Sequence, residues 1–327
     1  MVKQDRSRNY TAWVLLSAII FFIIIIGSFY FNKTRQGVIS PFSAFWFNPP
    51  TFLFSIYSEG NNALHEPVAV SQSVDGRIFV ADAGDKSIKV FDLAGKFKYK
   101  FGKLGTKGQL ETPVGIVVRD STVYVADSTK NQIFLFDLEG NFQRNLISRK
   151  TRAQLTGVTP VGIKIVQNNV FFTDILYHRV VQMDLLGNLI RTIGGPGNQV
   201  GRLAFPNDVA ISSDGRIYVS DSNNFRVQVC EDGEMLELFG SSDTSNPKSV
   251  LNSLVRGIAV DDDDLIWVVD TLGNNVGVFN EEGRPIYFLG SMEVDEAGMS
   301  FPNGISIDKE RLYVTDRGNK RVLVFSR

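Results

Sequence analysis

The chain has 327 residues, of which 34 are Lys or Arg and 35 are Asp or Glu, with one Cys and two His. Five of the basic residues and one of the acidic residues fall in residues 1–35, so the rest of the chain has a net charge of −5. This balance argues against a nucleic-acid-binding protein, because phosphate binding requires clustered Lys and Arg. The single Cys230 excludes an internal disulfide and is predicted to be buried filler in a strand.

The first segment, residues 1–9, is a short basic tail, and residues 10–31 contain no charged side chain. About 20 apolar residues in helical conformation span the hydrocarbon core of a bilayer. The sequence therefore predicts a transmembrane signal anchor with a cytoplasmic N-terminus and the rest of the chain outside the cytoplasm. A cleavable signal peptide is the alternative, but its apolar region is shorter and ends in small residues, which this segment lacks.

A linker, residues 32–50, follows the apolar segment. It contains the aromatic residues Phe42, Phe45, Trp46 and Phe47. Two interpretations stay open: the rings lie at the headgroup level of a membrane, where aromatic side chains are enriched, or they pack against the side of the folded domain.

Six copies of a short β-rich phrase make up residues 51–327, and each phrase ends in aspartate, as in Ile217-Tyr218-Val219-Ser220-Asp221. The six final residues are Asp82, Asp127, Asp174, Asp221, Asp270 and Asp316. Short strands repeating at about 45 to 50 residues are typical of a β-propeller, so six copies predict six blades. Each copy has four strand signals separated by Gly-containing turns, which predicts an all-β fold with four antiparallel strands per blade.

The two ends of the repeat region complete each other. The last copy stops at its third strand, near Phe325, and residues 52–57 before the first copy read as an unpaired fourth strand. We expect this N-terminal strand to pair into the last blade, because closure removes the exposed edges that promote aggregation.

The repeated aspartates are predicted to be structural, since a carboxylate at the end of a strand accepts backbone N–H groups in the following turn. The run from Asp261 to Asp264 is predicted to be a solvated hairpin turn. Consecutive side chains point apart and cannot supply the six to eight converging oxygens of a calcium site. No metal and no cofactor are expected.

The repeats resemble the NHL family of six-bladed propellers. The resemblance is clearest in residues 206–211, 215–222 and 225–229, and it extends over roughly residues 52–327. It implies the fold, whereas the function stays open because this fold serves scaffolds and enzymes alike. Amidating lyases of the family hold zinc with several histidines, and this chain has only His65 and His178. The lactonase-type propellers use Glu, Asn and Asp around calcium, and no matching motif is present.

Two rings of residues are the candidate binding site. The first lies at the start of the innermost strands, where three copies present valine (Val68, Val114, Val161) and three present Asn207, Arg256 and Asn303, with Asp208 beside Asn207. Such a channel mouth could orient an amphipathic ligand or a peptide carboxylate, with Arg256 as the anion contact; alternatively these groups hydrogen-bond channel water. The second is the apolar group in the loops after the second strands of copies three and four, which contains Ile175, Leu176, Tyr177, His178 and Phe225. These residues either contact a partner or pack against the neighbouring loop.

Together these features predict a membrane-tethered propeller outside the cytoplasm that binds a protein or peptide partner and no nucleic acid. A hydrolase or lyase that uses the channel mouth is the alternative. A third possibility is a passive spacer that binds a partner through the outer blade edges.

Overall fold

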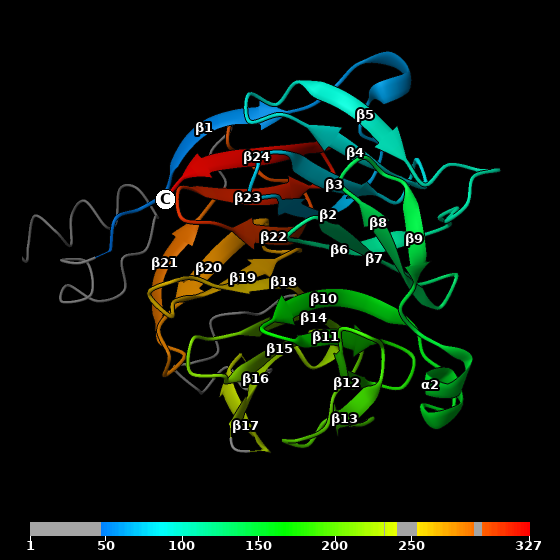
Figure 1. Ribbon diagram of the computed structural model, residues 1–327. Coiled ribbons are helices and arrows are strands. Elements are labelled where there is room, and N and C mark those ends of the chain that lie inside the picture. The colour runs from blue at the N-terminus through cyan, green and yellow to red at the C-terminus, as the bar shows by residue number, and fades with distance from the viewer. Residues whose placement is uncertain (1–46, 232, 241–253, 291–295) are drawn as a thin grey trace, which may run out of the picture.

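The computed structural model describes residues 47–231, 233–240, 254–290 and 296–327. They form six four-stranded antiparallel sheets arranged around a central axis (Figure 1). The predicted all-β, six-bladed propeller is therefore confirmed. Among the described residues, no helix has the length and apolar character needed to cross a bilayer, and the anchor predicted for residues 10–31 lies outside them.

Each blade runs from an inner strand at the axis to an outer strand at the rim. Blade one contains β2 (Pro67–Gln72), β3 (Ile78–Asp82), β4 (Ser87–Phe91) and β5 (Phe97–Phe101), and blade two contains β6 (Pro113–Arg119), β7 (Thr122–Asp127), β8 (Gln132–Asp137) and β9 (Phe142–Asn145). Blade three contains β10 (Pro160–Val166), β11 (Asn169–Asp174), β12 (Arg179–Asp184) and β13 (Leu189–Gly194). Blade four contains β14 (Pro206–Ile211), β15 (Ile217–Asp221), β16 (Arg226–Glu231) and β17 (Glu234–Phe239).

Blade five contains β18 (Val255–Val260), β19 (Ile266–Asp270), β20 (Asn275–Phe279) and β21 (Pro285–Leu289). Blade six contains β22 (Pro302–Ile307), β23 (Arg311–Asp316) and β24 (Arg321–Ser326), and its outer strand is β1 (Thr51–Ile56) from the start of the domain. The short helix α2 (Arg149–Gln154) lies between blades two and three. The 3₁₀ turns η2 (Gly60–Asn62) and η3 (Ser222–Asn224) complete the described elements.

The ring closes as the sequence predicts. β1 pairs antiparallel with β24, with Phe52 opposite Phe325 and Ile56 opposite Val322. The Ile56 side chain is fully buried, so the closing strand contributes to the core as well as to the hydrogen-bonded ladder.

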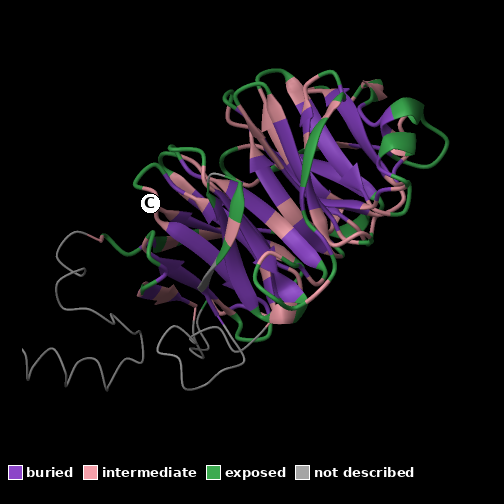
Figure 2. Ribbon diagram, turned by 90° about the horizontal axis from the view of Figure 1, so that it is seen from below, coloured by how far each residue is buried: buried purple, intermediate pink, exposed green. Residues whose placement is uncertain are grey.

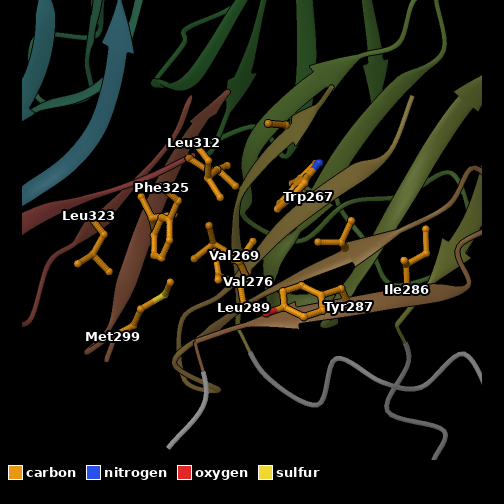
Figure 3. Close-up of a cluster of buried hydrophobic side chains, with 14 residues drawn as sticks. Trp267, Val269, Val276, Ile286, Tyr287, Leu289, Met299, Leu312, Leu323 and Phe325 are labelled. Carbon is orange, nitrogen blue, oxygen red and sulfur yellow. The ribbon is translucent and has the colours of Figure 1, made fainter. Parts of the chain in front are cut away.

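The core lies between neighbouring blades, and the exposed residues concentrate at the turns (Figure 2). One cluster joins blades five and six through Trp267, Tyr287, Met299, Leu312 and Phe325 (Figure 3). Side chains on both faces of each sheet are apolar because each sheet is covered on both sides by other blades. Cys230 is one of these buried side chains, as predicted, and burial raises the pKa of its thiol.

The linker contacts the propeller at Phe47. Its ring lies 6.0 Å from the ring of Trp267 and 5.4 Å from that of Tyr287, both in blade five. For this residue, packing against the folded domain is the correct alternative. Phe42, Phe45 and Trp46 lie outside the described residues.

The loops and hairpins of the propeller form two opposite faces, an upper face and a lower face. The upper face is formed by the loops that connect successive blades and by the loops between the second and third strands of each blade. The lower face is formed by the hairpins between the first and second strands and between the third and fourth strands. Inner strands begin at the upper face, where Pro67 pairs with Asp82 and Pro206 with Asp221.

The repeated aspartates bind loops of the upper face together. Asp82 accepts hydrogen bonds from the backbone N–H groups of His65 and Glu66, at 2.9 and 2.8 Å, and from that of Asp85 in the next turn. The structural role is therefore confirmed, and the carboxylate also fixes the loop before the inner strand. In three blades an arginine five residues later pairs with the aspartate at 2.7 to 2.9 Å: Arg179 with Asp174, Arg226 with Asp221, and Arg321 with Asp316.

Two of these arginines also donate hydrogen bonds to carbonyl oxygens of the loop before the inner strand. Arg226 donates from Nε to Asp221 and from Nη2 to the carbonyl oxygens of Gln199 and Arg202. Arg179 makes the same contacts to Leu155 and Gly157. Each buried charge is thus paired and hydrogen-bonded, which is the condition under which burial of an ion pair is tolerated.

We predict that Arg226→Met lowers the free energy of unfolding by about 3 kcal/mol, because it leaves the buried Asp221 carboxylate without its counter-ion. The matched control is Arg216→Met. Its partners Asp214 and Glu281 are both half exposed, so the loss of these ion pairs should cost at most about 1 kcal/mol. Urea denaturation of both variants measures the difference. Equal losses would contradict a special role for the buried pair.

We also predict that a chain beginning at Gly60 is less stable than one beginning at Phe47, because it lacks β1 and leaves the edge of β24 unpaired. Thermal unfolding of the two truncated proteins at equal concentration tests this. Identical melting temperatures and no increase in aggregation would show that β1 is dispensable.

Candidate functional site

The central channel is narrow. Its cavity has a volume of about 50 Å³ and is lined by residues of the inner strands of all six blades. A water molecule needs about 10 to 15 Å³ on the same measure, whereas drug-sized ligands occupy several hundred. The channel itself therefore has room for a few water molecules, and a larger ligand must bind at its mouth or elsewhere on the upper face.

Glycines cause the narrowing. A Cβ atom on Gly115 would lie 2.0 Å from the carbonyl oxygen of Val161, and one on Gly304 would lie 2.5 Å from that of Val68. Neighbouring inner strands thus approach each other through their backbones, and a side chain at these positions would force them apart. Gly162 and Gly257 occupy the equivalent positions of blades three and five.

Blades one and four lack this glycine and have Ala69 and Asp208 at the equivalent positions. Oδ1 of Asp208 accepts the N–H of Val209 and its Oδ2 accepts the N–H of Ile258, at 2.9 and 3.1 Å, so the carboxylate bridges the inner strands of blades four and five. Burial raises the pKa of Asp208 to about 6, while the positive charge of Lys164 opposes that change. Burial also lowers the pKa of Lys164.

The predicted mouth ring is only partly assembled. Val68, Val114, Asn207 and Asn303 line the channel together with Asp208, and both asparagines are buried. Val161 and Arg256 do not contribute to the lining. The three-valine, three-polar arrangement expected from the sequence therefore does not form around a single opening.

Arg256 has an unusual environment. It is half-buried, its Nε has no hydrogen-bond partner, and no carboxylate lies within ion-pair distance of it among the described residues. Burial lowers the pKa of Arg256, and the positive charge of Arg317 lowers it further. Within the described residues, the buried Nε of Arg256 is thus an unsatisfied hydrogen-bond donor.

The predicted loop residues of blade three divide into two groups. Ile175, Tyr177 and His178 are half-buried. The Tyr177 hydroxyl donates to the carbonyl oxygen of Thr156 at 2.6 Å, and Nδ1 of His178 accepts the N–H of Phe205 at 2.8 Å. These side chains hold loops in place, which is the packing alternative, and His178 joins blade three to blade four.

Leu176 and Phe225, in contrast, point to solvent, and the structure adds three residues that the sequence did not single out. Together these five residues form what we call the apolar arc, which follows the upper face from blade three to blade six. Its members, with their exposed fractions, are Leu176 (61%), Phe205 (47%), Phe225 (39%), Leu272 (58%) and Phe301 (51%). Two of the three added residues could have been found in the sequence, because Phe205 and Phe301 each stand directly before the proline that begins an inner strand.

A cleft lies beside the arc, between blades six and one. It has a volume of about 420 Å³ and is lined by His65, Glu66, Phe301, Arg317 and Gly318. Arg317 forms an ion pair with Glu66 across the boundary between the two blades. The cleft is large enough for a small ligand or the end of a peptide.

Among the described residues, no group of three or more His, Cys, Asp or Glu side chains is arranged to hold a metal ion. The run of four aspartates forms a hairpin turn, as predicted. Asp261, however, is buried. Its carboxylate accepts the indole N–H of Trp267 at 2.8 Å and the backbone N–H of Leu265 at 2.9 Å. Arg327 lies within 3.6 Å of three of these carboxylates and offsets their charge.

Comparison with known proteins agrees with this architecture. Residues 203–230 and 299–325, in blades four and six, match the NHL repeat. The chain therefore contains NHL repeats in a six-bladed β-propeller. No curated protein sequence is significantly similar to it.

Solved structures share the fold at low identity. Virginiamycin B lyase from Staphylococcus aureus is 16% identical, with a TM-score of 0.56 over 85% of this chain and 99% of the lyase. A gluconolactonase from Xanthomonas campestris is 13% identical, with a TM-score of 0.64 over 85% of this chain and 94% of the enzyme. A chain of the nidogen/laminin complex is 16% identical, with a TM-score of 0.57 over 73% of this chain and 83% of that one.

Two of these three proteins are enzymes. Identities of 13 to 16% demonstrate the fold alone, because propellers with the same architecture carry unrelated functions. The choice between the two hypotheses must come from this chain's own residues.

We predict that the free energy of unfolding of Asp208→Asn, compared with that of the natural protein, increases as the pH rises. The pKa of about 6 in the folded protein exceeds the ordinary 3.8. The folded state therefore holds the proton more tightly, and the stability gained from protonation is present below pH 4 and lost as the pH rises through 6. The asparagine variant has no such loss. Its free energy of unfolding relative to the natural protein should increase by about 2 kcal/mol between pH 4.5 and 7.5, as measured by urea denaturation. A difference between the two proteins that stays constant over this pH range would contradict the prediction.

Proposed function

We propose that this protein is an interaction platform whose upper face binds a segment of a partner protein, and that residues 10–31 tether it to a membrane with the propeller outside the cytoplasm. The apolar arc is the observation that carries the proposal. Five large apolar side chains, each more than a third exposed, follow one face of a rigid scaffold. Exposed apolar side chains gathered among polar loops on one face are characteristic of a protein contact.

The rigidity of the arc supports binding. Phe205 and Phe301 are fixed through their backbone N–H groups, which donate to His178 and Asn274 of the preceding blades at 2.8 Å. The Phe205 ring also packs edge-on against the His178 ring, with the ring centroids 4.6 Å apart. This aromatic group is therefore preorganised, and preorganised aromatic groups contribute most to affinity.

The position of the linker supports the orientation. Thr51 at the start of β1 pairs with Ser326 at the end of β24, which is the lower-face end of that strand. The chain therefore enters the propeller from the lower face, and an anchor N-terminal to Phe47 leaves the upper face free to meet a partner.

A hydrolase or lyase is the second candidate, and the named enzymes with this fold favour it. In this chain its catalytic group would be Asp208, because a carboxyl group with a pKa of about 6 can exchange a proton near neutral pH. Two observations weigh against it: both carboxylate oxygens already accept backbone N–H groups, and the channel around them holds only a few water molecules.

We predict that the double variant Leu176→Asp/Phe225→Asn loses its crosslinked partner when the full-length protein is captured from its own membranes. Both side chains are exposed, and asparagine tolerates the positive φ of Phe225, so the melting temperature should stay within about 2 °C of the natural protein. The matched control is Val74→Asp/Leu186→Asp, which changes two apolar residues on the lower face that are more exposed, at 96% and 76%.

Loss of the partner from the arc variant alone supports the platform. An unchanged partner in both variants would contradict it and direct attention to the blade edges. Turnover of a lactone or glycoside ester by the natural protein that Asp208→Asn abolishes would favour the enzyme instead.

A further inference from the structure

The charge of the propeller is divided unevenly between its two halves. Residues 51–202, which form β1 and blades one to three, contain 18 Lys or Arg and 13 Asp or Glu, a net charge of +5. Residues 203–327, which form the rest of the domain, contain 11 and 21, a net charge of −10. A cluster of cations in this negatively charged domain therefore indicates the chemistry of a partner.

The excess of cations gathers in three successive loops of the upper face. They are residues 102–112 between blades one and two, residues 128–131 after β7, and residues 146–159, which include α2. Glu111 is the one carboxylate in the sequence of these loops, and it pairs with Lys86. Five cations of the loops are exposed and form no ion pair with a residue that the structure describes. These five, which we call the basic patch, are Lys103, Lys107, Lys130, Arg149 and Lys150.

Hydrogen bonds hold the three loops next to one another. The hydroxyl oxygens of Thr112 and Thr129 lie 2.7 Å apart, which joins the first loop to the second. Arg152 of α2 donates to the carbonyl oxygen of Asn131 at 2.7 Å, which joins the second loop to the third. The cations of the basic patch are therefore carried by neighbouring loops in a fixed arrangement.

The third of these loops adjoins the apolar arc. The Tyr177 hydroxyl donates to the carbonyl oxygen of Thr156 at 2.6 Å, and Leu176, the first member of the arc, directly precedes Tyr177. α2 lies at the edge of the ring beside this contact (Figure 1). The basic patch on blades one and two thus continues into the arc, which begins on blade three.

An exposed leucine lies within the basic patch. Leu104 is 85% exposed and stands between Lys103 and Lys107. The loop that carries it is held by its own contacts, since the Thr106 hydroxyl donates to the carbonyl oxygen of Lys103 at 2.7 Å. The patch therefore offers an apolar contact among its cations, as well as positive charge.

We propose that the partner segment carries both acidic and apolar side chains, with its acidic residues on the basic patch and its apolar residues on the arc and Leu104. This inference rests on the proposed platform, because the arc supplies the apolar part of the contact. Charge complementarity identifies the occupant, since exposed cations without carboxylates of their own attract those of a partner. Recognition of acidic motifs by clustered cations is a recurring mode of peptide binding.

The test compares three peptides that carry an uncharged fluorophore and a C-terminal amide. The first is Glu-Glu-Asp-Glu-Gly-Leu-Gly-Leu-Phe, the second has Gln and Asn in place of the acidic residues, and the third has Lys. Fluorescence anisotropy with the full-length protein in an uncharged detergent should show the acidic peptide binding about tenfold more tightly than the neutral one, and the lysine peptide more weakly still. The preference should decrease as salt is added, because salt screens exposed charges.

Charge reversal tests the basic patch directly. The variant Lys103→Glu/Lys107→Glu/Lys150→Glu should bind the acidic and neutral peptides alike. The matched control changes the net charge by the same amount at three exposed cations of lower-face hairpins and should keep the full preference; it is Lys96→Glu/Arg284→Glu/Lys309→Glu. All six side chains are exposed, so both variants should melt within about 2 °C of the natural protein.

Equal binding of the acidic and neutral peptides by the natural protein, or binding of neither up to about 1 mM, overturns the proposal. Loss of the preference in both variants does so too, because it would reflect net charge alone. If a fluorescent phosphatidylglycerol or a labelled oligonucleotide binds and is lost from the patch variant, while the peptides bind alike, the patch recognises phosphate groups and the proposal is wrong. The platform is decided separately: a crosslinked partner that is lost from the arc variant and kept by the patch variant supports the arc and contradicts the acidic segment.

Discussion

The carboxylate at the end of the second strand is the interaction on which the upper face depends. Asp82, Asp127 and Asp316 each accept N–H groups from the loop before their own inner strand. Without these bonds the loops would have buried, unpaired donors, which cost far more than an exposed loop. In the part of the chain that the structure describes, five of the six repeats thus fix the loop before the inner strand in this way, and the variable residues of the upper-face loops are free to form the arc and the cleft.

This constraint also explains what the sequence could reveal. The aspartate phrases, the Gly turns and the orphan strand are local patterns with a direct physical meaning, so the blade number, the strand order and the closure by β1 were predictable. The structural role of Asp221 followed from its position alone. Its partner Arg226 and the contacts to Gln199 and Arg202 were not inferred, because they depend on how a loop 24 to 27 residues away returns to the strand.

The candidate site was less predictable. Arg256 was expected in the channel wall beside Asn207 and Asn303, but only the two asparagines line the channel. All three residues lie at register shifts near the start of their inner strands, and alternation along the sequence does not show where a side chain points next to such a bulge. Phe205 and Phe301 were missed because the residue before a proline looks like part of a strand start. Both adopt positive φ, which turns their rings toward solvent, and only the folded loop displays this.

The closure of the ring by β1 has a consequence for synthesis. The first strand of the domain pairs with its last, and a hydrogen bond from Thr51 to Ser326 spans 275 residues of chain. At about 5 to 20 residues per second, the ribosome needs roughly 15 to 60 s to make the partner of β1 after β1 itself has emerged. During that time β1 is an unpaired strand, and a chain truncated anywhere before β24 never completes its sixth blade. Closure therefore requires that translation has passed β24, so shorter products differ from the closed propeller by an open sheet edge that chaperones and proteases can recognise.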